Sequence, residues 1–162
     1  MDKHQSMVFN NLHRWMYSGQ QPNRVARAVN RLWAVVSAWG VAPNYLVTLE
    51  VQGRRSGRRT SFPLVMAVVD GEQYLVSMLG EHVAWVRNVR AAGGKATLRH
   101  GRTQEVRLDE VASEQRAPIL KAYLQCAPGA RPHIAVDKDA PLSEFENIAP
   151  TIPVFRVSAC ES

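Results

Sequence analysis

The spacing of apolar residues changes from helical to strand-like near residue 44. In residues 22–39, apolar side chains recur every three or four positions, which is the period of an amphipathic helix. From Asn44 onward, short segments rich in β-branched and aromatic residues alternate with turn residues, as in strands. The pattern predicts an N-terminal helical segment, residues 1–40, that packs on a β-rich domain, residues 41–162. The periodic apolar positions of the helix are Val25, Val29, Leu32 and Val36.

Short connections between the predicted strands indicate a mainly antiparallel sheet. Asp70 and Gly71 form a two-residue hairpin signal, and Gly101 marks a second tight turn. Closure into a small, partly open β-barrel removes exposed strand edges, so the fold class is α+β and mainly β. The predicted strands are 44–52, 60–70, 72–79, 95–100, 103–111 and 151–159. The predicted helices are 5–17, 22–39, 81–94 and 113–126, the last with Ser113 as its N-cap, and residues 127–150 are predicted as an ordered irregular loop that can contain a short helix.

The helix predicted at residues 22–39 has a cationic face with two open interpretations. Arg24, Arg27 and Arg31 lie opposite its apolar stripe. The helix either packs that stripe on the rest of the protein or makes peripheral contact with an anionic membrane. No export signal and no apolar run of spanning length is found, and Cys126 and Cys160 form no paired motif. These features predict a cytoplasmic protein with reduced thiols.

The most unusual segment is VQGRRSGRRTSFPL, residues 51–64. Four arginines surround two glycines between two predicted strands, in a chain of net charge +6. Guanidinium groups offer planar forks of donors that suit phosphate or carboxylate oxygens, so the turn is either an anion site or an exposed hairpin tip. The glycine spacing is too short for a phosphate-binding P-loop, and no lysine follows. The residues concerned are Gly53, Arg54, Arg55, Ser56, Gly57, Arg58 and Arg59.

Other residues carry weaker signals. Pro63 inside a strand indicates an edge, a bulge or a kink. Ser77 precedes a loop and a helix, and this segment either presents free helix amides to a ligand or simply connects a strand to a helix. Trp85 and Asn88 share a helix face, where the simpler interpretation is a core tryptophan and an asparagine bonded to a neighbouring loop. Because no nucleophile–base motif and no metal-ligand spacing occurs, an enzyme with this sequence would take its chemistry from a cofactor.

The order of motifs resembles the deazaflavin-dependent nitroreductase family of actinobacterial split β-barrel oxidoreductases. The motifs are GRRSG, SFPLVMAVVDGEQYLVSMLG, HVAWVRNVRA, GGKATLRHG and TIPVFRV, which together span about residues 44–158. The resemblance implies a split β-barrel related to FMN-binding reductases. It also implies coenzyme F-420 as the cofactor, a deazaflavin with an anionic tail, and FMN is the alternative. Reduced deazaflavin would give hydride to a small electrophilic substrate such as a quinone, an enone or a nitro compound.

The resemblance also implies which residues bind the cofactor. The basic turn would hold the anionic tail, and Pro63 and Leu64 would lie beside the ring. Tyr123 and His133 are candidate proton donors. Further positions match the cofactor-binding motifs of the family and would also bind the cofactor, namely Ser77, Met78, Leu79, Gly80, Trp85 and Asn88.

Three other assignments stay open at this point. One is a non-catalytic barrel that carries or sequesters a coenzyme or lipid, and another is an FMN-binding reductase. A third, nucleic-acid binding, lacks an aromatic stacking stripe near the arginines, so no specific nucleic-acid partner is expected. Related barrels suggest a homodimer.

Overall fold

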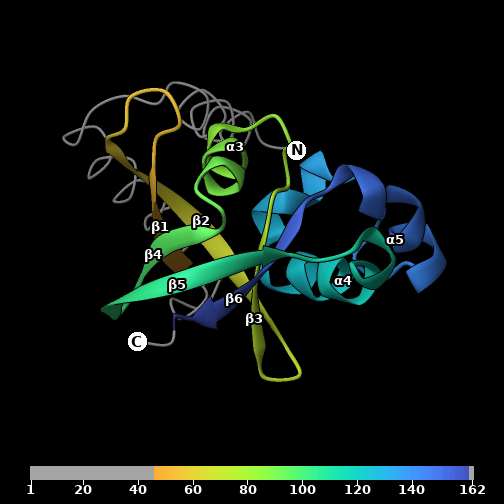
Figure 1. The fold of residues 1–162 in the computed structure, drawn as a ribbon. Coiled ribbons are helices and arrows are strands. Elements are labelled where there is room, and N and C mark those ends of the chain that lie inside the picture. The colour runs from red at the N-terminus through yellow and green to blue at the C-terminus, as the bar shows by residue number, and fades with distance from the viewer. Residues whose placement is uncertain (1–45, 161–162) are drawn as a thin grey trace, which may run out of the picture.

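A computed structural model describes residues 46–160, which form a six-stranded β-barrel with one α-helix at an end and two along an outer face (Figure 1). The strand order is β1-β2-β3-β6-β5-β4, closed by pairing of β1 with β4, and every pair is antiparallel. The split-barrel prediction is confirmed. The predictions for residues 1–40, including membrane contact by residues 22–39, lie outside the described residues. The strands are β1 (Leu46–Gln52), β2 (Arg59–Val69), β3 (Glu72–Val76), β4 (Lys95–His100), β5 (Arg102–Glu110) and β6 (Val154–Ala159).

The helices lie between β3 and β4 and between β5 and β6. The first is α3 (Ala84–Ala91), and the others are α4 (Ala117–Cys126) and α5 (Leu142–Ile148). The part of the chain that the structure describes also contains three short 3-10 helices, namely η2 (Ser113–Gln115), η3 (Pro128–His133) and η4 (Ala149–Thr151). No helix within residues 46–160 has the length and apolar content needed to cross a membrane.

The β2–β3 hairpin forms where the sequence predicted it. Asp70 and Gly71 have φ angles of 51° and 79°, the left-handed pair that a tight two-residue hairpin turn requires. Asparagine, aspartate and glycine tolerate this region best, so the local sequence fixes both the turn and the strand register.

Several predicted boundaries are wrong. The helix predicted at 81–94 is Ala84–Ala91, and the last strand begins at Val154 rather than at 151.

Two further errors involve serine residues. β3 ends at Val76 rather than at 79. The Ser77 amide still donates to the Pro153 carbonyl, but Pro153 has no N–H group to return the bond, and the Ser77 hydroxyl donates to the Gly80 carbonyl. The Ser113 hydroxyl caps no helix and donates to the adjacent Glu114 carboxylate.

The helix that was predicted at 113–126 begins at Ala117 instead. Pro118 therefore falls in its first turn, where a missing N–H group costs little. Residues 127–150, predicted as an irregular loop that can contain a short helix, contain η3 and the short helix α5.

Strand β2 separates two hydrophobic clusters. Leu64 and Met66 face the barrel interior and belong to the first cluster, which also contains the buried side chains of α3. Val65 and Ala67 alternate to the outside and pack with the second cluster, formed with α4 and α5. The barrel is thus filled from one end by α3 and covered on one outer face by α4 and α5.

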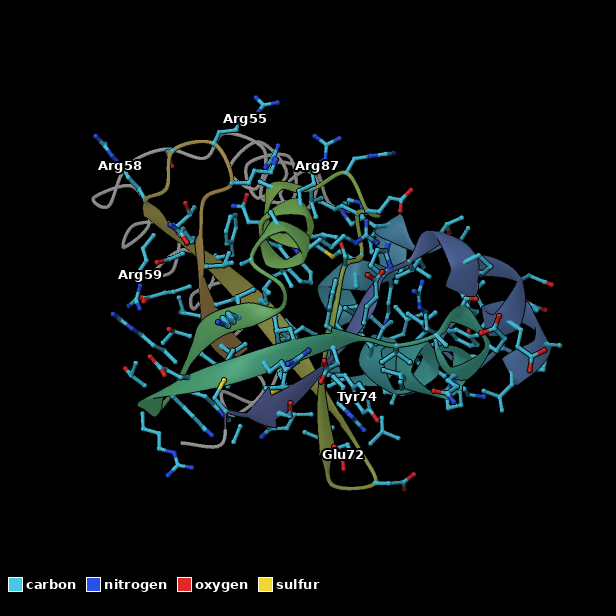
Figure 2. All side chains as sticks on the ribbon, in the orientation of Figure 1. Arg55, Arg58, Arg59, Glu72, Tyr74 and Arg87 are labelled. Atoms are coloured by element: carbon cyan, nitrogen blue, oxygen red, sulfur yellow. The ribbon has the colours of Figure 1, made fainter. Side chains whose placement is uncertain are left out.

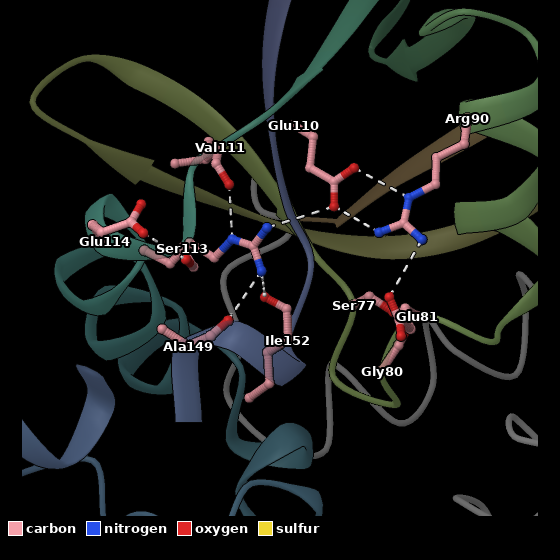
Figure 3. Close-up of polar contacts among 11 residues, drawn as sticks. Ser77, Gly80, Glu81, Arg90, Glu110, Val111, Ser113, Glu114, Ala149 and Ile152 are labelled. Atoms are coloured by element: carbon pink, nitrogen blue, oxygen red, sulfur yellow. Dashed lines mark hydrogen bonds and ion pairs between the residues drawn. The ribbon is translucent and has the colours of Figure 1, made fainter. Parts of the chain in front are cut away.

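A chain of ion pairs ties these parts together (Figure 3). Arg90 of α3 pairs with Glu110 of β5 at 2.7 Å and with Glu81, just before α3, at 3.5 Å. Arg116 pairs with Glu110 at 3.5 Å and donates to the carbonyls of Val111, Ala149 and Ile152. Burial is the main cause of a lowered Arg116 pKa, and the four acceptors offset the cost of burying this cation.

Candidate functional site

The basic turn, residues 53–59, is closed by its own main chain. The Gly53 amide donates to the Arg58 carbonyl at 2.8 Å, and the Gly57 amide donates to the Gly53 carbonyl at 2.9 Å. Gly57 has a φ of 67°, which side chains disfavour. A Cβ atom on Gly53 would lie 2.8 Å from the Ser56 Oγ atom and 3.2 Å from the Arg58 carbonyl oxygen. Both glycines therefore have a steric reason to be where they are.

Helix α3 fixes the turn in space through Asn88. The Asn88 Oδ1 atom accepts hydrogen bonds from the Arg54 amide at 3.2 Å and from the Arg54 Nη1 atom at 3.1 Å. Asn88 is buried, with 4% of its surface exposed. The simpler expectation, an asparagine bonded to a neighbouring loop, is confirmed, and that loop is the basic turn itself.

Trp85 anchors the same helix in the barrel. It is fully buried, and its ring meets Phe155 edge-on with the centroids 5.5 Å apart. Its Nε1–H group has no hydrogen-bond partner among the residues that the structure describes. The core role expected for this tryptophan is confirmed, and it holds the face of α3 that carries Asn88.

The cations gather at this end of the molecule (Figure 2). Burial and then the neighbouring charges of Arg55 and Arg87 lower the pKa of Arg54. Arg87 lies on α3, where its Nη2 atom is 3.5 Å from His82 Nδ1. Sequence reasoning missed Arg87, and the signal that could have found it was its place directly before Asn88.

The four arginines of the basic turn are not equivalent. Arg59 lies 3.6 Å from the carboxylate of Glu50, which also pairs with Arg99 at 2.9 Å. Arg55 and Arg58 are exposed and have no carboxylate partner within residues 46–160. Arg59 is therefore partly neutralised, whereas the other three cations are available to an anion.

Among the strands of residues 46–160, Pro63 and Leu64 lie on a free edge of β2. In this part of the chain, residues 59–65 pair with β1 only, and residues 66–69 pair with β3. The register through Pro63 is continuous, so of the three alternatives for this proline the edge is correct. Both residues are buried, and Leu64 reaches the cluster that contains Trp85.

The loop formed by residues 77–80 lies between the two hydrophobic clusters. Leu79 packs against the first cluster and Met78 against the second. Ser77 is buried, and its hydroxyl is used by the Gly80 carbonyl. The loop is therefore held at both ends before the chain enters α3.

The structure does not bring Tyr123 to the basic turn. Tyr123 lies in α4, within the second cluster, and burial raises its pKa above the ordinary value. Burial also raises the pKa of the neighbouring Cys126 thiol to about 11. His133 ends η3, which follows α4, and is exposed. Basic turn and α4 occupy different ends of the view in Figure 1.

These residues fit an anionic group at the basic turn. Burial, and then the neighbouring charges of Arg55 and Arg87, lower the Arg54 pKa, and a bound anion would relieve the repulsion among these cations. The turn is rigid, because its backbone and Asn88 hold it before any ligand arrives. A preorganised cluster of guanidinium groups is suited to phosphate or carboxylate oxygens.

Fold and site together define a split β-barrel that presents an arginine-rich turn beside a free strand edge. Residues 23–142 match the family model described as F420H(2)-dependent quinone reductase. The chain belongs to this family. It is therefore an oxidoreductase that depends on coenzyme F-420, which decides between the two cofactors that the sequence left open.

Solved structures agree on the fold. An F420-H2 dependent reductase (FDR-A) aligns at a TM-score of 0.51 and 20% identity, covering 70% of this chain and 94% of its own. A structure described as a domain-swapped dimer aligns at a TM-score of 0.51 and 19% identity, and the alignment covers 84% of this chain and 98% of that one. The protein Atu2129 from Agrobacterium tumefaciens str. C58, of unknown function, aligns at a TM-score of 0.53 and 12% identity. That alignment covers 78% of this chain and 54% of the other. No curated protein is similar enough in sequence to be matched.

Proposed function

We propose that this coenzyme F-420-dependent oxidoreductase reduces a small electrophilic molecule, with a quinone as the first candidate and enones and nitro compounds as further ones. The observation that supports it most is the family match over residues 23–142, whose description names a quinone reductase. One similar structure is described as an F420-H2 dependent reductase. The preorganised basic turn supports the same assignment, because this cofactor carries an anionic tail.

In this proposal the basic turn holds the anionic tail of the cofactor. Arg54 is the oriented contact, while Arg55 and Arg58 supply less ordered positive charge. The free edge of β2 at Pro63 and Leu64 and the loop at residues 77–80 receive the ring. When bound, the reduced cofactor supplies a hydride to the substrate.

The chain's own tasks are to orient the reactants, exclude water and provide a proton. Barrel side chains such as Leu64 and Leu79 make the ring side of the site apolar. His133 is the more accessible candidate for the proton donor, because it is exposed, whereas Tyr123 is 3% exposed. Both stay proposals until their variants are assayed.

Turnover of reduced coenzyme F-420 under anaerobic conditions tests the proposed function. We expect return of the oxidised cofactor's absorbance when menadione, cyclohexenone or a nitroimidazole is added, and loss of activity in Arg54→Gln at limiting cofactor. The exposed Arg102, on another hairpin, gives the matched control Arg102→Gln. If the protein binds coenzyme F-420 tightly but reduces none of these compounds, the carrier alternative is favoured instead.

Assembly and location belong to the same proposal. We propose a homodimer, since one similar structure is described as a domain-swapped dimer. Light scattering after size exclusion tests it, and a monomer at all concentrations would contradict it. Cytoplasmic location and membrane contact through residues 22–39 are proposed from the sequence alone. Sedimentation with anionic vesicles tests the membrane contact. The full chain should sediment with the vesicles more than a variant in which Arg24, Arg27 and Arg31 are neutralised.

A further inference from the structure

We infer that Asn88 is a positioning residue that orients the Arg54 guanidinium toward the cofactor's anion while leaving its charge unneutralised. The inference rests on the proposed function in one respect, namely that the anion binds at the basic turn. It goes further by assigning Asn88 a role that acts through Arg54 rather than by contact with the ligand.

The geometry gives Asn88 control of Arg54. A single oxygen, Asn88 Oδ1, accepts from the Arg54 main chain at 3.2 Å and from its Nη1 atom at 3.1 Å. These two bonds fix both the start of the turn and the direction of the side chain. Guanidinium has five N–H donors, so most of its fork stays available for an anion. The bonds join positions 34 residues apart, and the acceptor lies on a helix anchored by the fully buried Trp85.

The chemical type of the acceptor is what sets this arginine apart. Two other arginines that join elements each pair with a carboxylate, since Arg90 and Arg116 both contact Glu110, and Arg116 adds three main-chain carbonyls. Asn88 instead offers a neutral amide oxygen. Arg54 is thereby held in place with its full charge, next to the charges of Arg55 and Arg87. An arrangement built only for stability would gain from a carboxylate at this position, because a carboxylate would relieve the repulsion.

Replacing Asn88 with aspartate separates the two roles. A carboxylate of nearly the same shape can accept both hydrogen bonds and adds an ion pair, so a merely structural role predicts an unchanged or improved protein. If Asn88 serves anion binding, the same change neutralises the oriented cation and weakens binding. Ala91 is exposed and lies one turn further along α3, so Ala91→Asp adds the same charge without contacting Arg54.

The experiment measures two quantities on wild type, Asn88→Asp and Ala91→Asp. The first is the thermal unfolding midpoint by circular dichroism. The second is the Kd for oxidised coenzyme F-420, by fluorescence titration at several KCl concentrations. We expect Asn88→Asp to unfold at or above the wild-type temperature and to bind about tenfold more weakly or worse, the loss expected for a charge-assisted contact. Ala91→Asp should bind within about threefold of wild type, as a screened surface charge does. Affinity should also depend less steeply on KCl in Asn88→Asp.

Equal affinities of Asn88→Asp and wild type, or equal losses in Asn88→Asp and Ala91→Asp, would overturn the inference. If Asn88→Asp does not fold, Asn88→Ala replaces it. That variant should weaken binding yet keep the wild-type salt dependence, and unchanged affinity would overturn the inference.

Inorganic pyrophosphate, titrated by calorimetry, distinguishes this inference from the proposed function. One outcome is that the wild type does not bind the coenzyme, while pyrophosphate binds the wild type and Ala91→Asp more tightly than Asn88→Asp. That outcome would refute the proposed function and support the role of Asn88. Wild type that binds neither compound would refute both.

Discussion

Replacing Arg54 with glutamine tests the account of the basic turn at its best-ordered cation. The change removes the guanidinium that Asn88 orients and leaves the Arg54 main-chain amide, with its bond to Asn88, in place. Because the turn is closed by Gly53, Gly57 and Arg58 main-chain bonds, we expect the fold to persist. The effect should therefore appear in cofactor affinity.

The magnitude follows from the kind of contact that is lost. A hydrogen bond to a charged partner contributes about 1.5–3 kcal/mol, and exposure of Arg54 to solvent puts it at the lower end. A loss of about 1.5–2 kcal/mol corresponds to roughly 10- to 30-fold in Kd. Arg55 is exposed and held by no residue of the described chain, so Arg55→Gln should cost about two- to fivefold, as a solvated ion pair does.

Fluorescence titration with oxidised coenzyme F-420 at low and high KCl measures these affinities. Arg102→Gln is the charge-matched control. The β1–β4 register pairs Arg99 with Thr48 and Thr97 with Glu50, so β4 runs away from the basic turn and Arg102 lies at the opposite end of the barrel. The reasoning is refuted if Arg54→Gln and Arg102→Gln have the same Kd, or if Arg55→Gln costs more than Arg54→Gln.

Further predictions concern stability and thiol chemistry. Alanine at Gly57 or Gly101, whose φ angles are 67° and 72°, should each cost about 1–2 kcal/mol in urea unfolding, but only Gly57→Ala should also weaken cofactor binding. Arg116→Met removes a donor shared by the Val111, Ala149 and Ile152 carbonyls and one of the two cations that contact Glu110, so it should lower the free energy of unfolding by about 3 kcal/mol; a change under about 0.5 kcal/mol would contradict the packing described. Because burial raises the Cys126 pKa to about 11, a thiol reagent at pH 8 should label exposed Cys160 quickly and Cys126 only on unfolding, and equal rates would contradict this. Since the unfolded Cys126 thiol loses its proton at lower pH than the folded one, stability should also fall as pH rises from about 9 toward 11, and less so in a Cys126→Ala variant.

The barrel could be predicted because its signals are local. Alternation of apolar residues along β2 assigns Leu64 and Met66 to one face and Val65 to the other, and Asp70 and Gly71 set the hairpin. The errors at Ser77 and Ser113 have a different origin. Each hydroxyl is used by a nearby group that sequence periodicity cannot reveal, so the ends of β3 and the start of α4 were misplaced.

The candidate site was predictable in composition but not in its internal order. The basic turn and the shared face of Trp85 and Asn88 can be identified from the sequence. Which loop Asn88 would bind depends on packing between positions 34 residues apart. The partial neutralisation of Arg59 by Glu50, from the neighbouring strand, and the approach of Arg87 likewise depend on the closed barrel and on where α3 enters it.

A crystal structure of the chain with oxidised coenzyme F-420 tests the central claim most directly. The account predicts anionic oxygens of the tail within about 3 Å of the Arg54 guanidinium, with the Asn88 contact retained, and the ring along the free edge of β2 at Pro63 and Leu64. A tail bound at the opposite end of the barrel, near Arg102, or a ring placed against α4 in the second cluster would contradict it.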